Sequence, residues 1–570
     1  MREPVDLLVR GTLVDVNTGR LEDRAIAVDD GEIVAFEERP AAREIETAYV
    51  TPGLIDAHTH VEASMVTIPQ YGAAVVPHGV TSVVHDPHEI ANVTGAEGVR
   101  NFSADAADTA LKARMTVPSS VPASPLQDAG ATMDADAVAA LLDAERAIAL
   151  GEVMDLPAVL DGDEGTHAKI RAARERGLTV DGHVPGVTGA PLQELARYLD
   201  TDHESVTREE ARAKADAGFR VYLREGSTSK NLDALVDVVD EVDSRRLSLC
   251  SDDRSVVDIL DRGGVNEAVE KAIALGVDPV TAVQMATINT AEAYDLPFGR
   301  VEPGAPADMV LLSDLESWDV EHVVVDGVVD PTADDDPPTE SSVATDTVTF
   351  DPVAPSDLAI EHAGPGPVEV CVESAVGSFR TERTTASVPV ESAAGEDSVL
   401  TANGEVDVLP MAVIERHGGP GTIGCGFVHN LGLDRGAIGT TIAHDAHNCV
   451  VAGVTHEAMA TVANRLREVD GGLAVYDPAT DACTTLPLPV AGMLSNAPIE
   501  ETARAFEAVV NAADDIGCTV PGGVLELSYL ALEVIPEVRL TNNGLVDVEA
   551  GEYIDVVLSD RQGLSGNPSQ

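Results

Sequence analysis

Short apolar runs alternate with amphipathic stretches between residues 51 and 295. Runs such as TSVVHD, LTVDGHV and LSLCSDD have the length and β-branched content of buried strands, whereas PLQELARYL and NLDALVDVVDEV place apolar residues at helical spacing. Strands that alternate with helices over about 245 residues are typical of a parallel sheet closed into a barrel. The pattern therefore predicts an α/β fold with a TIM-like (β/α)8 barrel over residues 51–295.

A different pattern flanks this segment on both sides. Residues 6–49 contain short runs separated by turns, including an Asp-Gly pair that is typical of a β-hairpin. The same pattern of short apolar runs separated by turns occurs again in residues 307–330. We therefore expect residues 1–50 and 296–330 to form one small β-sandwich-like domain, which the barrel interrupts.

The segment of residues 331–346, PTADDDPPTESSVATD, shows neither the helical nor the strand periodicity of apolar residues. It is rich in Pro, Asp, Ser and Thr, which indicates an acidic linker. After it, β-like runs such as PVEVCVES precede helix-like stretches such as IEETARAFEAVVNAA. Residues 347–570 are therefore expected to form a C-terminal α+β domain.

Charge narrows the possible functions. The 570 residues include 98 acidic and 36 basic side chains, a formal charge of −62. Proteins that bind nucleic acid through phosphate contacts need a basic surface, so the composition excludes this class. Only five of the basic residues are lysine, and the acids are spread along the chain. This imbalance favours a salt-adapted, haloarchaeal-like cell, in which concentrated ions screen surface repulsion.

Hydrophobic residues make up 44% of the chain, enough to bury several cores. We find no run of about 18 uncharged apolar residues and no signal-peptide pattern at the N-terminus. The six cysteines lie far apart without a CxxC pair, which indicates reduced thiols. We expect a cytoplasmic protein without a membrane partner, which acts on a small molecule and forms a homo-oligomer, a dimer.

The strongest chemical signal is TPGLIDAHTHVEASM at residues 51–65, an apolar strand that ends in Asp56, His58 and His60. Side chains two apart on a strand face the same way, so the two histidines can bind one cation. If this strand is the first of the barrel, its C-terminal end opens on the face that carries active sites. A lone HxH pair can also arise by chance, so the residues at the other strand ends decide whether a metal site is predicted.

Ionisable residues recur where later apolar runs end. They are His85, His88, Glu152, His183, His203, Asp252 and Asp253. Each of them alone could be a capping or loop residue. Several strand ends that each offer a histidine or a carboxylate are what a metal centre in a barrel mouth requires. The joint pattern therefore predicts a metal-dependent enzyme.

The segment TPGLIDAHTHVEASM resembles the first-strand signature of the amidohydrolase superfamily, and the run continuing to VVPHGVTSVVHDPHEIANVTGAEGV resembles the adenine deaminase family in particular. The similarity extends through GEVMDLPAVL, DGHVPGVTG, TDHES, LREGSTSKNLDAL, CSDDR and RHGGPGTIGCGFVHNLGLDRGAIGTTIAHDAHN. It covers nearly the whole chain apart from the linker. HxH alone is shared by many members of the superfamily, whereas PHEIAN, DTDHES and AHDAHN are the specific part.

This resemblance implies hydrolysis of adenine to hypoxanthine and ammonia in purine salvage. It also implies two divalent metal ions, with Mn²⁺ as the first choice and Fe²⁺ or Zn²⁺ as alternatives. The implied ligands are His58 and His60 for the first ion, Glu152 as the bridge, His183 and His203 for the second ion, and Asp252 from the last strand. Glu152 stands where many relatives carry a carboxylated lysine. Asp252 would also take a proton from the attacking water and return it to the leaving nitrogen.

Two assignments keep an alternative. Asp253 could replace Asp252, because neighbouring strand residues face opposite ways and only one can look into the barrel. Substrate contacts are expected in loops near the metal mouth, from His88, Glu89, Arg224, Glu225 and Ser227. For Arg224, an internal ion pair with a glutamate competes with substrate recognition.

The C-terminal part has its own cluster, formed by His417, His444, Asp445 and His447. His444 and His447 are three apart, close enough on a helix to share a face. The cluster could bind a further metal, close over the barrel mouth or stabilise an interface.

Two other functions stay open. A cyclic-amide hydrolase of the dihydroorotase or hydantoinase type would use similar metals, but its usual bridging lysine is missing here. A non-catalytic protein on a barrel scaffold would predict broken ligand sets.

Overall fold

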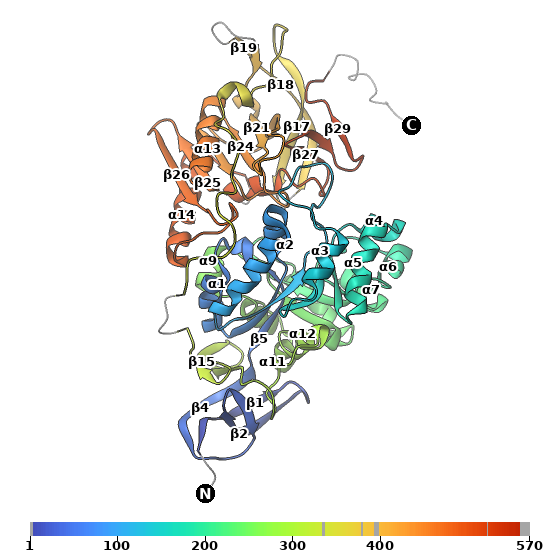
Figure 1. Cartoon of the computed structure of the whole chain (residues 1–570), viewed down its shortest axis with the longest axis vertical. Helices are drawn as coiled ribbons and strands as arrows, with labels where there is room; N and C mark the ends of the chain where they lie inside the picture. The colour runs from blue at the N-terminus through green and yellow to red at the C-terminus, as the bar shows by residue number, and fades with distance from the viewer. Residues whose placement is uncertain (1–3, 333–336, 378–379, 393–397, 521–522, 559–570) are drawn as a thin grey trace.

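The computed structural model describes residues 4–332, 337–377, 380–392, 398–520 and 523–558, and it has three parts arranged along its long axis (Figure 1). A sheet that contains the N-terminal strands lies at one end, the barrel lies in the middle, and the C-terminal sheet lies at the other end. Among the described residues, no helix is long and apolar enough to cross a membrane.

Parallel strands form the wall of the barrel. They are β5 (Leu54–His60), β6 (Val80–His85), β7 (Lys112–Val117), β8 (Ala147–Val153), β9 (Thr179–Gly182), β10 (Thr201–Asp202), β11 (Arg220–Arg224), β12 (Leu247–Cys250) and β13 (Asp252–Asp253). Hydrogen-bonded neighbours run from β5 to β9 and from β10 to β12. The Asp200 N–H donates to the Val180 carbonyl at 2.9 Å between these two groups, and β13 pairs with β5. The predicted α/β barrel is confirmed, with its wall built from the apolar runs.

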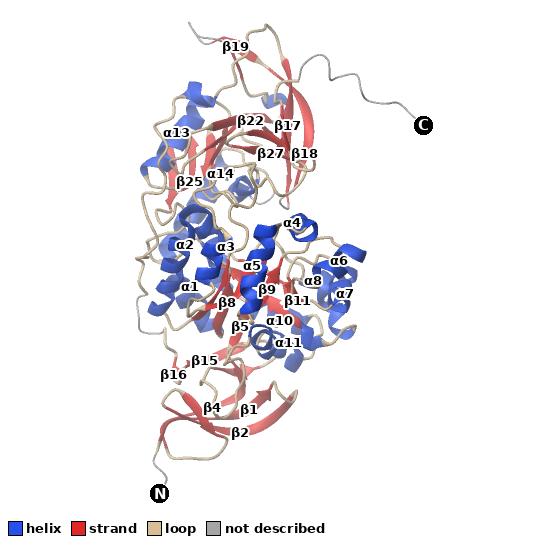
Figure 2. Ribbon diagram, turned by 45° about the vertical axis from the view of Figure 1, so that its right-hand side comes forward, coloured by secondary structure: helices blue, strands red, loops and turns tan. Residues whose placement is uncertain are grey.

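Helices cover the outside of this wall (Figure 2). They are α1 (Ile68–Val75), α2 (His88–Asp105), α3 (Ala135–Leu141), α4 (Leu156–Asp161), α5 (Glu164–Glu175), α6 (Gly189–Leu195), α7 (Arg208–Ala217), α8 (Leu232–Leu235), α9 (Val256–Arg262), α10 (Asn266–Ala274), α11 (Pro279–Met285) and α12 (Ile288–Tyr294). Helix α5 is an example of how a capping residue and buried apolar residues define such a helix. Asp163 accepts the Thr166 N–H at 2.8 Å and caps the first turn, while Ile170 and Ala173 are buried against the barrel.

Strands from both flanks of the barrel segment form one seven-stranded sheet. Its order is β16-β15-β14-β4-β1-β2-β3, with β1 (Val5–Asp15), β2 (Arg20–Asp29), β3 (Glu32–Ala35), β4 (Ala41–Pro52), β14 (Met309–Asp314), β15 (Asp319–Val325) and β16 (Val328–Val329). In the β2–β3 turn, Asp30 and Gly31 have φ of 50° and 80°. Positive φ at both central positions is what a two-residue type I′ turn needs, so this Asp-Gly pair sets the hairpin.

The C-terminal part is built on an eight-stranded sheet. Its order is β18-β17-β22-β21-β24-β23-β25-β26, with β17 (Val368–Gly377), β18 (Arg380–Val388), β21 (Val408–Ile414), β22 (Ile423–His429), β23 (Ala437–Thr440), β24 (Cys449–Gly453), β25 (Gly472–Asp477) and β26 (Ala482–Pro487). Smaller sheets pair β19 (Val390–Ser392) with β20 (Ser398–Leu400) and join β27 (Val538–Thr541), β28 (Gly544–Asp547) and β29 (Glu552–Ile554).

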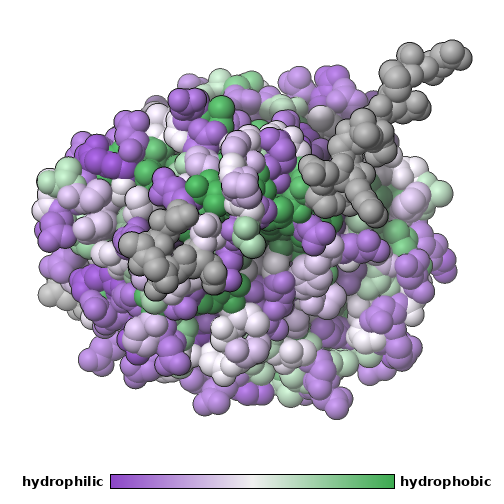
Figure 3. Space-filling view, turned by 90° about the horizontal axis from the view of Figure 1, so that it is seen from above, coloured by the Kyte–Doolittle hydropathy of each residue, from purple (hydrophilic) through white to green (hydrophobic). Residues whose placement is uncertain are grey.

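Two long helices, α13 (His456–Glu468) and α14 (Ile499–Asp515), pack on the C-terminal sheet. Helix α13 buries Met459, Val462 and Leu466, which recur at helical spacing. Seen from this end, hydrophilic residues predominate at the rim of the molecule, with hydrophobic residues between them (Figure 3).

The C-terminal part is fastened to the barrel on the face where the parallel strands end. The Ser495 N–H donates to the Met65 carbonyl at 2.8 Å, just beyond β5. The Ile499 N–H donates to Gln70 Oε1 at 2.9 Å. Because these contacts lie beyond the carboxyl ends of the barrel strands, the C-terminal sheet and its loops cover the barrel mouth.

A buried ion pair supports the short strand β10. Lys214 in α7 is fully buried, and its Nζ donates to Asp202 Oδ2 at 2.8 Å and to Glu210 Oε1 at 2.9 Å. Asp202 also accepts the Val184 N–H at 2.9 Å. The lysine therefore neutralises two buried carboxylates.

We predict that Lys214→Met destabilises the barrel by about 3–5 kcal/mol, because it leaves Asp202 and Glu210 buried without a cation. Urea unfolding monitored by circular dichroism measures the change. Arg197→Ala is the control, since Arg197 pairs with Glu194 on the surface, and we expect it to cost less than about 1 kcal/mol. Equal midpoints for the two variants would refute the role of the buried pair.

Candidate metal centre

Two histidines at the end of β5 face the barrel interior. His58 and His60 are 0% and 6% exposed, and their Nε2 atoms lie 3.2 Å apart. The Nδ1 atom of His58 lies 3.2 Å from Asp181 Oδ2, and the Nδ1 atom of His60 lies 2.9 Å from the Asp86 carbonyl. Carboxylate and carbonyl oxygens accept hydrogen bonds, so in a neutral ring that binds a cation Nδ1 would carry the hydrogen and Nε2 would present the lone pair.

The facing lone pairs fit a metal site. Two imidazole lone pairs at 3.2 Å repel each other unless a cation lies within reach of both. Histidine ligands of metals also hold their second nitrogen against a carboxylate or a carbonyl, which fixes the ring and raises its basicity. The pair His58 and His60 has both properties, so its donor atoms suit a divalent cation.

Glu152, near the end of β8, lies between two groups of imidazoles. Its Oε2 atom lies 2.7 Å from His183 Nδ1 and 3.3 Å from His203 Nε2. Its Oε1 atom lies 3.2 Å from His60 Nε2 and 3.3 Å from His88 Nδ1. Burial alone would raise the pKa of this carboxyl, but the surrounding histidines hold it well below its usual value. The ionised carboxylate therefore lies within reach of imidazoles on both sides.

Asp252, in β13, reaches the same centre from the opposite side of β5. Its Oδ1 atom lies 3.2 Å from His60 Nε2 and 3.7 Å from His58 Nε2, and its Oδ2 atom accepts a hydrogen bond from Arg224. Burial would raise the pKa of Asp252, but Arg224 and His60 hold it well below its usual value. Asp253 turns the other way and lines a neighbouring cavity, where burial and then Asp252 raise its pKa.

Overlapping triplets of donors describe the whole centre. The donor atoms lie within 4.8 Å of one another in His58/Glu152/His203, His58/His60/Asp252, His60/His88/Glu152 and His183/His203/Glu204. The structure thus brings together the six residues that the sequence proposed as ligands, and it adds His88 and Glu204. His85 stays outside, where burial lowers its pKa to about 4.

Three of the five residues expected to contact substrate lie in different surroundings. Arg224 forms ion pairs with Asp252 and Glu204, so it supports the metal centre. Glu225 faces away from the centre and binds Lys271 Nζ at 2.8 Å. Ser227 lines the neighbouring cavity and donates a hydrogen bond to Asp258.

Sequence reasoning missed Asp181, which holds His58 from behind, and Glu204, which lies among the donors of the centre. Asp181 lies two residues before His183 on β9, and Glu204 directly follows His203. The same two-residue alternation that singled out His58 and His60 could have marked Asp181 as inward-facing. For Glu204 the sequence contains no comparable signal, because it lies beyond the end of β10.

The C-terminal cluster contacts the barrel mouth through Glu89. His444 Nδ1 and His447 Nε2 each bind one oxygen of this carboxylate. Burial would raise the pKa of Glu89, but the two histidines hold it well below its usual value, and Glu89 in turn raises the pKa of His444 to about 9. His444 and His447 lie in a turn and not on a helix, and the Ala446 carbonyl of this turn accepts a hydrogen bond from His417 Nε2 at 2.8 Å.

Comparisons with known proteins agree with this architecture. The amidohydrolase family model matches residues 49–329, and the model of the adenine deaminase C-terminal domain matches residues 379–552. The adenine deaminase from Desulfatibacillum aliphaticivorans is 38% identical over 571 residues, which cover 97% of this chain and 97% of that protein. The adenine deaminase from Listeria monocytogenes is 38% identical over 568 residues, which cover 97% of this chain and 96% of that protein. One from Salinibacter ruber is 36% identical over 558 residues, 97% of this chain and 99% of its own. These relatives are bacterial.

Among solved structures, the crystal structure of an adenine deaminase aligns with 57% of this chain and 98% of its own length, with a TM-score of 0.43 and 18% identity. The structure of an enamidase aligns with 59% of this chain and 98% of its own, with a TM-score of 0.45 and 17% identity.

We predict that Asp181→Asn weakens metal binding about 10- to 100-fold, because the amide no longer fixes the hydrogen on His58 Nδ1 as a carboxylate does. Competition with a chelator of known affinity measures the change. Asp161→Asn, at the exposed end of α4, serves as the control and should bind metal like the parent. Unchanged affinity in a folded Asp181→Asn variant would contradict this orienting role.

Proposed function

The chain belongs to the adenine deaminase family of the amidohydrolase superfamily, and on this premise we propose the site roles that follow. The protein is a hydrolase that acts on a C–N bond and converts adenine to hypoxanthine and ammonia. Its similarity to curated adenine deaminases extends over 97% of the chain and includes the family's C-terminal domain.

One observation separates this function from cyclic-amide hydrolysis. Glu152 stands among four imidazoles, where many binuclear relatives would carry a carboxylated lysine. The lysines of this chain are occupied elsewhere or exposed. Lys112 binds Asp308, Lys169 binds the Ser119 carbonyl, Lys214 binds Asp202, Lys271 binds Glu225 and Lys230 is exposed. None of them reaches the centre.

We propose that the donors hold two divalent cations. His58, His60 and Asp252 would hold the first, His183 and His203 the second, and Glu152 would bridge them. Imidazole and carboxylate ligands suit Mn²⁺ or Fe²⁺ and also accept Zn²⁺, and we take Mn²⁺ as the first choice. Bound cations of this kind lower the pKa of water from 15.7 toward about 7 and so supply a nucleophile at neutral pH.

Asp252 is proposed as the proton carrier. Arg224 holds one carboxylate oxygen and leaves Oδ1 facing the histidines. From there the carboxylate takes a proton from the attacking water. It then returns this proton to the amino nitrogen, because NH₃ leaves readily whereas the amide ion does not. His88, which contacts Glu152 and lies 3.5 Å from Glu89, would act at the same mouth as a contact for the purine ring.

The cellular setting is also a proposal. The charge of −62 supports a salt-rich cytoplasm, where ions screen the surface. We further propose that the active form is a dimer and that the protein serves purine salvage. The three-part division into residues 1–50 with 296–330, 51–295 and 347–570, joined by the linker 331–346, is supported by the separate sheets.

We predict that Mn²⁺-loaded protein in molar KCl releases ammonia from adenine, and that Glu152→Ala abolishes turnover. Asp252→Asn should lower kcat about 10²- to 10⁴-fold, the usual contribution of a positioned acid–base group. Asp253→Asn is the matched control, since its side chain faces the neighbouring cavity, and it should keep most of kcat. A larger loss in Asp253→Asn than in Asp252→Asn would reverse the assignment. Inert adenine with hydrolysis of dihydroorotate or a hydantoin would overturn the substrate.

A further inference from the structure

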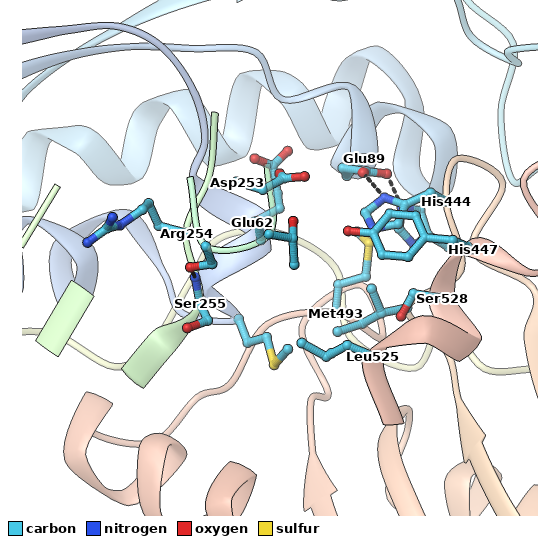
Figure 4. Close-up of a pocket in the computed structure, with 16 residues that line it drawn as sticks. Glu62, Glu89, Asp253, Arg254, Ser255, His444, His447, Met493, Leu525 and Ser528 are labelled. Atoms are coloured by element: carbon cyan, nitrogen blue, oxygen red, sulfur yellow. Dashed lines mark hydrogen bonds and ion pairs between the residues drawn. The ribbon is translucent and has the colours of Figure 1, made fainter. Parts of the chain in front are cut away.

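A cavity lies beside the metal centre, between the barrel mouth and the C-terminal domain (Figure 4). Its empty volume, with its opening to solvent included, is about 570 Å³. The barrel contributes Glu62 in η1 (Val61–Ser64) and Asp253. The C-terminal domain contributes His444 and side chains of η8 (Gly523–Tyr529). Neither part alone forms this cavity.

Glu62 is a polar side chain of the cavity whose hydrogen bonds are incomplete, as are those of Ser528 and Arg254. It is 4% exposed, and its Oε1 atom accepts only a long hydrogen bond, 3.5 Å from the Ile90 N–H. Its Oε2 atom has no hydrogen-bond partner among the described residues. Buried carboxyl oxygens without partners are costly, so such an atom in a cavity is available to a ligand.

The opposite wall is fixed in place. His444 is held by Glu89 and stacks on Tyr529, with ring centroids 4.8 Å apart and planes inclined by 17°. Figure 4 shows Glu62 and Asp253 on one side of the cavity and the Glu89–His444–His447 contacts on the other. Met493 and Leu525 complete the C-terminal side with apolar surface. A flat heterocycle therefore has apolar contacts for its faces and the unpaired Glu62 oxygen as an acceptor for its edge.

We propose that Glu62 accepts the ring N–H of the five-membered ring of the bound purine, and that this contact selects free 6-aminopurine bases over N9-substituted purines such as nucleosides. The inference rests on the proposed function. With C6 at the metal centre, the N9 position lies at the other end of the molecule, in the cavity. A substituent there removes the donor and needs the space that the C-terminal domain occupies. Glu62 is thus a specificity-determining residue and takes no part in proton transfer.

The test compares adenine with 9-methyladenine, in which a methyl group replaces the N9 hydrogen. For the parent enzyme we expect kcat/KM to fall at least about 100-fold with 9-methyladenine, because a site built for a hydrogen bond rejects an analogue that lacks it. Equal kcat/KM for the two substrates would overturn the proposal without any variant.

Two variants then test Glu62 itself. In Glu62→Ala, and in the similarly sized Glu62→Leu if the first fails to fold, KM for adenine should rise about 10- to 100-fold, the usual effect of leaving one partner of a buried hydrogen bond unpaired. The kcat value should change less than about threefold, and discrimination against 9-methyladenine should shrink. Glu270→Ala removes a partly buried carboxyl of α10 that does not line the cavity and should leave both constants unchanged. Equal losses with both substrates would contradict the contact.

Binding without turnover separates the two proposals. Calorimetry with hypoxanthine and 9-methylhypoxanthine measures the preference of the metal-loaded parent and of Glu62→Ala. If adenine releases no ammonia but hypoxanthine binds more tightly than its methyl derivative, only the proposed function fails. If ammonia is released but the two bases bind equally, only the role of Glu62 fails.

Discussion

Burial of ionised carboxylates among imidazoles is the constraint on which the rest of this structure depends. Glu152 is 3% exposed and lies within 3.3 Å of four histidine nitrogens, while the Nε2 atoms of His58 and His60 face each other at 3.2 Å. Lone pairs and charges in a medium of low polarity interact strongly, so this cluster is stable only when positive charge balances it. The barrel brings these groups together by ending several parallel strands at one point, each with a histidine or a carboxylate at or near its carboxyl end.

The ligands are held from behind by groups that do not themselves face the centre. Asp181 fixes His58, the Asp86 carbonyl fixes His60, and Arg224 fixes Asp252. These contacts select the ring nitrogen or the oxygen that faces inward, and they keep the donors in place before any ion arrives. The C-terminal domain is held to the barrel by a similar contact, because Glu89 at the barrel mouth binds two histidines of that domain. Covering the mouth limits the access of water to the reacting atoms.

The sequence predicts those features that depend on local periodicity. His58 and His60 could be assigned to one face because a strand repeats every two residues, and the alternation of strands and helices was sufficient for the barrel. The same repeat states that Asp252 and Asp253 face opposite ways without saying which one faces inward. The structure places Asp252 at the centre, with φ of 57° and its carbonyl bound by Thr59 Oγ1 at 2.9 Å.

Features that depend on distant contacts could not be predicted in this way. His444 and His447 have a spacing that suits a helix, yet they lie in a turn and meet Glu89, 355 and 358 residues earlier in the chain. Glu225 pairs with Lys271, which removes it from the centre although its neighbour Arg224 stays. Side-chain partners of this kind are set by packing between elements, and local patterns carry no record of them.

The central claim is that Glu152 holds two cations together in one centre. Metal analysis of purified protein, after equilibration with Mn²⁺ and removal of free ions, tests it most directly when the parent is compared with Glu152→Ala. The account predicts two ions per chain in the parent and at most one in the variant, with both proteins folded by circular dichroism. Two ions retained in Glu152→Ala, or a parent that binds fewer than two, would contradict it.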